Sequence, residues 1–236
     1  MKIIAFSTAV LFASLGGNLG AGTPSSAEVV LAAAKEATGG AAWDRAEGCT
    51  EEGSHGDGAI RYTTRFSLRH YGMRVDGEQG GQTRSMGFNG VAPWRSSEGR
   101  TMVASDPAQL SEAILTDYIS INGFFFPDRF PATFTYLREA AEAGRGYDVL
   151  AITPKGSRTL EIWFDRETHL IRRVVDVQGT PPTKVEADQY RTIDGLTIAT
   201  RLTIFGPDGA VADHGAVLSF RCGPIDQAIF APPKDS

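Results

Sequence analysis

The feature that most constrains this chain is a series of predicted β-strands that follow one another from residue 147 to residue 221. Turn signals such as Asp194-Gly195 and Pro207-Asp208-Gly209 separate the strands, about every eight to twelve residues, as in a sheet whose neighbouring strands are joined by hairpins. A long meander must close, or curve around something apolar, to hide its edges and one face. The pattern therefore predicts a container.

The first half of the chain has the same character. Apolar and polar residues alternate from residue 60 to residue 71 and predict one long strand. Further strands are expected at residues 73–75, 83–88 and 91–96, with turns at Asp76-Gly77 and Asn89-Gly90. Together these patterns predict an α+β, mainly β fold. Its single, strongly curved antiparallel sheet of about eleven strands forms an incomplete barrel, with two or three helices covering the concave side.

Two helices are marked by their ends. The first spans residues 27–38, begins with the capping-box pattern Ser25-x-x-Glu28 and stops at Gly39-Gly40. The second follows Ser105-Asp106-Pro107, a sequence typical of a helix N-terminus. A strand is expected to start the sheet at Trp43.

The chain begins like a secreted protein. Lys2 precedes the apolar run Ile3 to Leu15, and small residues follow, which is the pattern of a signal peptide and is too short to span a bilayer. Cleavage is expected after Ala21, with Ala27 as the alternative. Residues 22–236 then form one domain that is periplasmic or secreted and soluble, with no transmembrane segment.

The charge of the chain limits the classes of partner that it is expected to bind. The net charge of −5 and pI near 5.4, without a basic run, argue against nucleic acid and against docking on anionic lipid surfaces.

Cys49 and Cys222 are the only cysteines, and an oxidising compartment favours a disulfide between them, a staple across the two ends of the barrel. The alternative is two buried free thiols.

A loop between the second helix and the next strand is unusually aromatic. Phe124, Phe125, Phe126 and Phe130 lie among glycine and prolines, so their rings must be covered. They form either a small core beneath the loop or a flap over an apolar cavity.

No catalytic or metal-binding pattern stands out. The histidines at positions 55, 70, 169 and 214 have no spacing that places two ligands on one face, and no nucleophile elbow or phosphate loop is present. We expect no enzyme activity, no metal and no cofactor.

One segment resembles a known family. The hairpin Trp163-Phe164-Asp165-x-x-Thr168-x-Leu170-Ile171-x-Arg173, followed by Tyr190-Arg191-x-x-Asp194-Gly195-Leu196-x-Ile198, is similar to LolA/LolB-like periplasmic proteins, the outer-membrane lipoprotein-sorting superfamily. The resemblance implies an incomplete eleven-stranded barrel whose apolar concave side is covered by helices and binds acyl chains without chemistry or cofactor. The chain departs from the family where Ala199, and not proline, follows Ile198.

The leading functional hypothesis is a non-catalytic carrier that holds a lipid, a lipoprotein acyl chain or another apolar ligand in the half-barrel. One alternative is an interaction or regulatory module with a filled core that recognises envelope proteins, and a less favoured one is an envelope hydrolase. The residues expected to line the wall and the opening of the cavity are Tyr62, Phe66 and Leu68, and Phe124, Phe125, Phe126 and Trp163, respectively.

Overall fold

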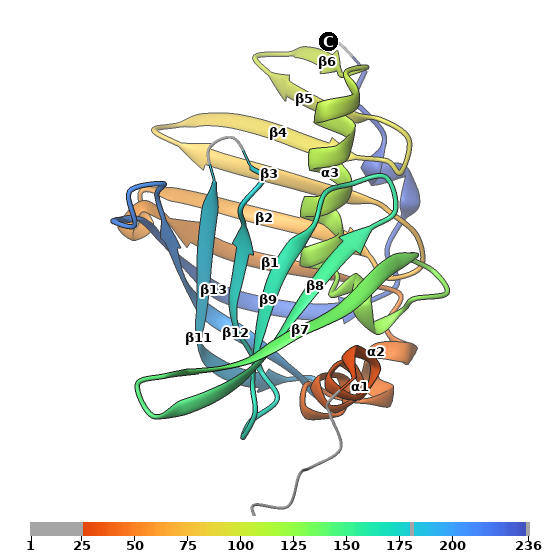
Figure 1. Cartoon of the computed structure of the whole chain (residues 1–236). Coiled ribbons are helices and arrows are strands. Elements are labelled where there is room, and N and C mark those ends of the chain that lie inside the picture. Colours follow the sequence, from red (N-terminus) through yellow and green to blue (C-terminus); the bar gives the residue numbers. More distant parts are fainter. Residues whose placement is uncertain (1–25, 180–181, 235–236) are drawn as a thin grey trace, which may run out of the picture.

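A computed structural model describes residues 26–179 and 182–234. The predicted signal peptide and Ser25 lie outside these residues. All the strands of the described residues belong to one antiparallel, thirteen-stranded sheet that curves strongly without closing (Figure 1). The fold class is therefore confirmed, with two strands more than predicted. No helix in the described part of the chain is long and apolar enough to cross a membrane.

The bounds of the elements are as follows. The helices are α1 (Ala27–Ala37), α2 (Ala41–Arg45) and α3 (Pro107–Ser120). The strands are β1 (Gly48–His55), β2 (Ile60–Ser67), β3 (Met73–Gln79), β4 (Gln82–Phe88), β5 (Pro93–Ser97), β6 (Arg100–Val103), β7 (Ala132–Glu142), β8 (Arg145–Pro154), β9 (Leu160–Asp165), β10 (Ile171–Asp176), β11 (Thr183–Ile193), β12 (Leu196–Phe205) and β13 (Val211–Gly223).

The order of the strands makes α3 a bridge between the two edges of the sheet. Strands β1 to β6 pair in sequence, strands β7 to β13 pair in sequence, and the two series meet where β1 pairs with β13. The edges are therefore β6 and β7, which are consecutive in the chain. Helix α3 connects them and lies along the open side of the sheet (Figure 1), where it can cover the concave face.

A disulfide fastens the seam between the two series of strands. Cys49 of β1 lies directly opposite Cys222 of β13, and the two are joined across 173 residues of sequence. The staple therefore holds the middle of the sheet, and the expected position across the ends of the barrel is wrong. The reason is topological, since the first and last strands are neighbours and neither is an edge.

The helices begin and end for local reasons. Ser26, and not the predicted Ser25, caps α1 by accepting a hydrogen bond from the Val29 amide. Gly39 and Gly40 have positive φ values after α1, as predicted. The first strand, expected from Trp43, begins only at Gly48. Its predicted start is wrong because a short helix, α2, buries the Trp43 indole, whose Nε1 donates to the Thr38 carbonyl oxygen at 3.1 Å.

The hairpin between β3 and β4 also differs from its prediction. Asp76-Gly77 is not a turn but lies inside β3, where the Asp76 carboxylate accepts hydrogen bonds from Arg65 and Arg74. The chain turns instead at Gly80-Gly81, where both residues have positive φ. The long strand expected from residue 60 ends at Ser67. There the Ser67 hydroxyl accepts a hydrogen bond from the Arg69 amide in a turn.

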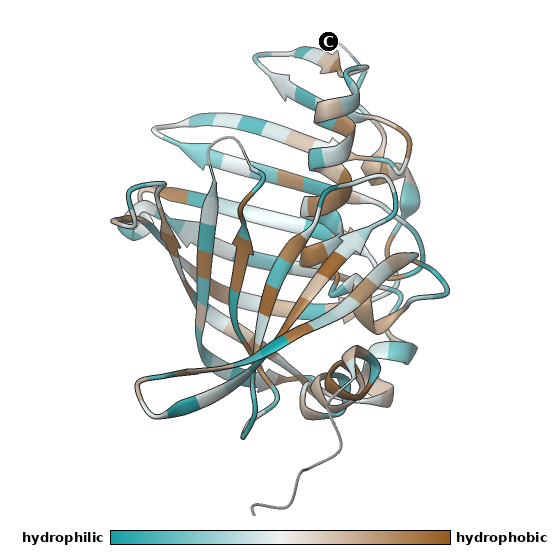
Figure 2. Ribbon diagram, in the orientation of Figure 1, coloured by the Kyte–Doolittle hydropathy of each residue, from teal (hydrophilic) through white to brown (hydrophobic). Residues whose placement is uncertain are grey.

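The core lies on the concave side of the sheet. Figure 2 shows apolar positions recurring along α1, α3, β8 and β9. Val30, Leu31 and Ala34 of α1 are buried against the sheet, and they repeat at helical spacing. The convex side carries most of the ion pairs of the N-terminal strands, including those of Asp76 with Arg65 and Arg74.

Candidate functional site

The aromatic loop fills the centre of the barrel. Phe124, Phe125, Phe126 and Phe130 are all at most 6% exposed, and the rings of Phe124 and Phe125 meet edge to face with centroids 4.7 Å apart. Asn122 adopts a left-handed conformation at the end of α3 and turns the chain inward. The loop is thus packed as core. The concave side also has two spaces, and of the four rings only that of Phe125 lines one of them.

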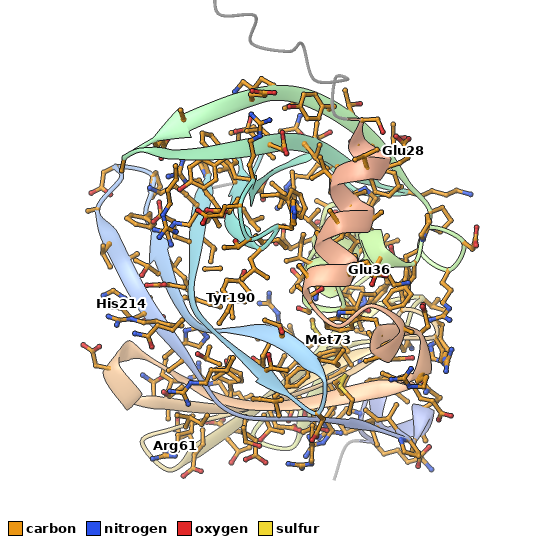
Figure 3. The ribbon with its side chains drawn as sticks, turned by 90° about the horizontal axis from the view of Figure 1, so that it is seen from below. Glu28, Glu36, Arg61, Met73, Tyr190 and His214 are labelled. Carbon is orange, nitrogen blue, oxygen red and sulfur yellow. A yellow bond between two sulfur atoms is a disulfide. The ribbon has the colours of Figure 1, made fainter. Side chains whose placement is uncertain are left out.

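The smaller space is an inner cavity of about 270 Å³ at the end of the barrel covered by α1. It brings together two of the residues predicted for the ligand site, Phe66 of β2 and Phe125 of the aromatic loop. Phe220 of β13 completes this wall, with its ring centroid 6.3 Å from that of Phe66. Figure 3 looks into this end and shows Tyr190 inside the curved sheet, whereas Arg61 lies on its outside.

The inner cavity has polar groups as well. The Tyr62 hydroxyl donates to Glu51 Oε1 at 2.8 Å, and Glu51 lines the cavity. Burial raises the pKa of the Glu51 carboxyl above its ordinary value. A more polar pocket of about 400 Å³ adjoins this cavity and shares three lining residues with it, Ile171, Ala187 and Tyr190. The cavity is therefore small and mixed in character.

The other predicted residues do not line this cavity. Leu68 is fully buried in the core just after β2. Phe124 is likewise core, and Phe126 lies beneath the Lys35 ammonium and the Arg129 guanidinium, 5.1 and 4.8 Å from its ring centroid. Tyr62 supports the site through its bond to Glu51 and is not among the lining residues.

Trp163 lies on the outer face of the sheet and not at the opening predicted for it. It alternates along β9 with Ile162 and Phe164, which are in the main core, and packs in a separate cluster with Tyr147 and Val149. The Arg173 guanidinium is 4.5 Å from its ring centroid. The side-chain alternation of a strand explains the error.

The larger space is a groove of about 650 Å³ between α3 and strands β3 to β6. We call it the methionine groove, because Met73, Met86 and Met102 line it. Met73 and Phe88 form its buried floor. Met86 and Met102 form a rim and are 47% and 72% exposed. Thioether side chains adapt to irregular apolar ligands, and exposed clusters of such residues mark binding surfaces.

Helix α3 supplies the facing wall. Gln109, Glu112, Ala113 and Thr116 line the groove, and their spacing places them on one face of the helix. Leu115 and Tyr118, on another face, are buried in the core. The small side chains of Ala113 and Thr116 leave room between the helix and the sheet.

Two polar contacts hold this wall in place. Asp117, which is completely buried, accepts a hydrogen bond from the Gly72 amide through Oδ2 at 2.8 Å. Arg158 forms ion pairs with Glu112 of α3 and with Asp176 of β10. Burial raises the pKa of the Asp117 carboxyl to about 8, against the opposing effect of the Gly72 hydrogen bond.

The groove was missed at the sequence level although part of its signal was visible. Met86 and Phe88 alternate with polar neighbours on a predicted strand, which would have placed them on one face. Met102, however, lies on β6, a strand that was not predicted. The position of β6 opposite α3 depends on tertiary contacts, which a local sequence pattern does not predict.

One histidine has a carboxylate partner. His55 Nδ1 lies 3.2 Å from Asp213 Oδ2, and its ring centroid is 5.1 Å from that of Tyr62. No serine or threonine hydroxyl within the described ranges is hydrogen-bonded to His55. In the same residues no group of three His, Cys, Asp or Glu side chains could hold a metal ion.

No family model and no curated protein matches the sequence, but solved structures match the fold. A DUF1329 family protein from Desulfovibrio piger is 13% identical with a TM-score of 0.61, covering 87% of this chain and 97% of that one. A LolA superfamily protein from Nitrosomonas europaea is 12% identical with a TM-score of 0.59, covering 88% and 98%. An outer-membrane lipoprotein-sorting protein domain from Vibrio parahaemolyticus is 15% identical with a TM-score of 0.56, covering 86% and 97%. At these identities the likeness concerns the fold alone, and the chain has a LolA-like fold.

Proposed function

We propose that this protein is a non-catalytic carrier of the bacterial envelope that holds the hydrocarbon chain of a lipid or lipoprotein in the methionine groove. The observation that carries the proposal is the groove itself, with its buried floor of Met73 and Phe88 and its exposed rim of Met86 and Met102. A volume of about 650 Å³ lies within the range of small-molecule sites, roughly 300 to 1,000 Å³. The inner cavity, at about 270 Å³, is smaller than that range, and the pocket that adjoins it is more polar and suits a hydrocarbon chain less well.

The physical driving force is the removal of apolar surface from water. Met86 and Met102 remain largely exposed, and covering one such side chain contributes roughly 1.5 to 3 kcal/mol. A hydrocarbon chain that lies between α3 and the rim covers both. The LolA-like fold, shared with a lipoprotein-sorting domain, is consistent with a ligand of this class.

The filled centre of the barrel supports the alternative of an interaction module only in part. Phe124 and Phe130 are buried in the main core, as that alternative requires. The methionine groove nevertheless stays open beside them. We therefore place the ligand in the groove and not in the centre of the barrel.

Native mass spectrometry of the protein purified from an envelope fraction, followed by lipid extraction, tests the proposal. We expect a co-purifying lipid, and we expect the emptied protein to bind the neutral probe N-phenyl-1-naphthylamine. Met86→Gln/Met102→Gln should weaken probe binding by roughly ten- to a hundredfold, because two apolar contacts are lost.

Leu218→Gln is the matched control. Leu218 is 60% exposed on β13 and lines a shallow pocket far from α3 in the fold, so its loss should leave probe binding unchanged. Absence of co-purifying lipid together with absence of probe binding would contradict the proposal. Equal effects of the control and of the double variant on probe binding would contradict the placement of the ligand site in the methionine groove.

A further inference from the structure

Three exposed arginines share a face of the sheet with the methionine groove. Met86 pairs with Arg95, which pairs with Met102. One step along the same face, Arg84 pairs with Ser97, which pairs with Arg100. Directly paired residues project from the same side of an antiparallel sheet, as do alternate residues of one strand.

The arginines are close enough to share one anionic group. Neighbouring strands lie about 4.8 Å apart, so the positions of Arg84 and Arg100, two strands apart, are separated by roughly 10 Å. Arg95 lies on the strand between them. Guanidinium groups on long side chains can therefore converge on a single carboxylate or phosphate.

These arginines are not neutralised by the protein. Arg84, Arg95 and Arg100 are exposed and have no side-chain partner among the described residues. By contrast, Arg65 and Arg74 on the other face both pair with Asp76. The convergence of unpaired arginines is thus specific to the groove face.

The carboxylates near the groove leave this positive charge in excess. Asp106 accepts from the Ala108 amide as the cap of α3, and Glu112 pairs with Arg158. Glu98, in the turn between β5 and β6, is the carboxylate closest in sequence to the arginines. Three arginines therefore face two carboxylates that form no ion pair within the described residues, Asp106 and Glu98, so positive charge remains in excess.

Polarity changes in one direction along this face. The buried floor, Met73 and Phe88, lies nearest α3, and the row of Met86, Arg95 and Met102 comes next, with Arg95 between the two methionines. The row of Arg84 and Arg100 follows, towards the hairpin turns, which lie at the ends of the strands away from α3 (Figure 1). The face is thus apolar at its floor, carries one arginine in the methionine row and is cationic at its solvent end.

We propose that the methionine groove binds an anionic amphiphile, with its hydrocarbon chain along Met86 and Met102 and its carboxylate or phosphate head group at Arg84, Arg95 and Arg100. This inference rests on the proposed function and adds the charge of the ligand. The net charge of −5 opposes docking on an anionic bilayer, so the arginines recognise a single extracted molecule and not a membrane surface.

The test is isothermal titration calorimetry with ligands that share a twelve-carbon chain and differ in head group, each below its micelle concentration. The ligands are dodecyl phosphate, a neutral dodecyl polyethylene glycol ether, dodecyltrimethylammonium and, as a head group without a chain, inorganic phosphate. We expect dodecyl phosphate to bind about tenfold more tightly than the neutral ether, the gain typical of a charge-assisted hydrogen bond. The cationic ligand should bind most weakly.

A triple variant assigns this preference to the arginines. Arg84→Gln/Arg95→Gln/Arg100→Gln should bring dodecyl phosphate and the neutral ether to within about threefold of one another. The variant Arg61→Gln/Arg69→Gln/Arg191→Gln removes the same charge from exposed arginines elsewhere and should keep the wild-type preference.

The outcomes separate the two proposals. Equal binding of all three dodecyl ligands by the wild type would overturn the charge inference and leave the carrier function standing. Inorganic phosphate that binds as tightly as dodecyl phosphate would overturn an amphiphile site in favour of a simple anion site. Failure of every dodecyl ligand to bind would overturn the proposed function itself.

Discussion

The carboxylate of Asp117 accepts a hydrogen bond from the amide of Gly72 at 2.8 Å, and this bond ties α3 to the connection between β2 and β3. Asp117 is completely buried. Its other oxygen, Oδ1, has no hydrogen-bond partner among the described residues, nor do the hydroxyls of Tyr71 and Tyr118. The wall of the methionine groove is therefore anchored by a carboxyl that burial keeps in its neutral form at moderate pH.

This anchor predicts a pH dependence of stability. Burial raises the pKa of Asp117 to about 8 in the folded protein, from an ordinary 3.8. Between these values the folded state holds a proton that the unfolded state has released, so the free energy of unfolding should fall as pH rises from about 4 to about 8. Asp117→Asn keeps an oxygen that can accept from Gly72 and has no charge, so it should flatten this fall.

The measurement is urea denaturation at several pH values from 4 to 9. Asp128→Asn is the control, because Asp128 is exposed and this substitution should keep the wild-type profile. Parallel profiles for the wild type and Asp117→Asn would show that Asp117 does not titrate in this interval.

The disulfide should contribute strongly to stability. Cys49 and Cys222 close a loop across 173 residues and fasten the only pairing between the two series of strands in the described sheet. Cys49→Ser/Cys222→Ser should lower the free energy of unfolding by about 2 to 5 kcal/mol. Reducing agent should destabilise the wild type equally and leave the double variant unaffected. A wild-type urea midpoint that is insensitive to reduction would contradict the staple.

Packing of the aromatic loop can be measured separately from ligand binding. Phe124 is 2% exposed and contacts the rings of Tyr118, Phe125 and Phe164. Phe124→Ala should cost about 3 to 5 kcal/mol of stability, as expected for a large cavity in a core. Val29→Ala, at a position 62% exposed, should change stability by less than about 0.5 kcal/mol. If Phe124 belonged to a flap, its loss would alter binding and spare stability.

Gly87 provides a test of the packing behind the groove, because it lies on the face of β4 opposite to Met86 and Phe88. A Cβ atom at this position would meet the Trp94 ring at 2.5 Å and the Met73 carbonyl oxygen at 2.8 Å. Gly87→Ala should therefore lower stability by about 1 to 3 kcal/mol, measured by thermal or urea unfolding. Gly223→Ala is the matched control, because a Cβ at that strand position meets nothing within 4 Å. Similar stability of the two variants would show that Trp94 does not pack on Gly87 as described.

The sequence predicted the fold better than the site, for physical reasons. Alternation and turn residues are local, so the series of strands from residue 147 to residue 221 was predicted, and it corresponds to β8 to β13. The side of the sheet on which a strand places its aromatic residue depends on curvature and register, and Trp163 was assigned to the wrong side for that reason. The methionine groove needs β6 and α3 together, and β6 has only four residues, which is too short for a periodic pattern.

The composition describes the charge of the whole molecule but not the positions of individual charged residues. The net charge of −5 argues against an anionic surface as a partner. It does not reveal that Arg84, Arg95 and Arg100 converge on one face, because that convergence is a consequence of strand register.

The most direct test of the methionine groove is nuclear magnetic resonance of protein with ¹³C-labelled methyl groups on methionine, isoleucine and valine. Met73, Met86 and Met102 line the groove, and Met1 is the only other methionine in the chain. We predict that a bound dodecyl ligand gives intermolecular nuclear Overhauser effects to the methyl groups of Met86 and Met102. Saturating ligand that gives such effects only to residues of the inner cavity, such as Ile198 and Val217, and none to the methionines would contradict the account.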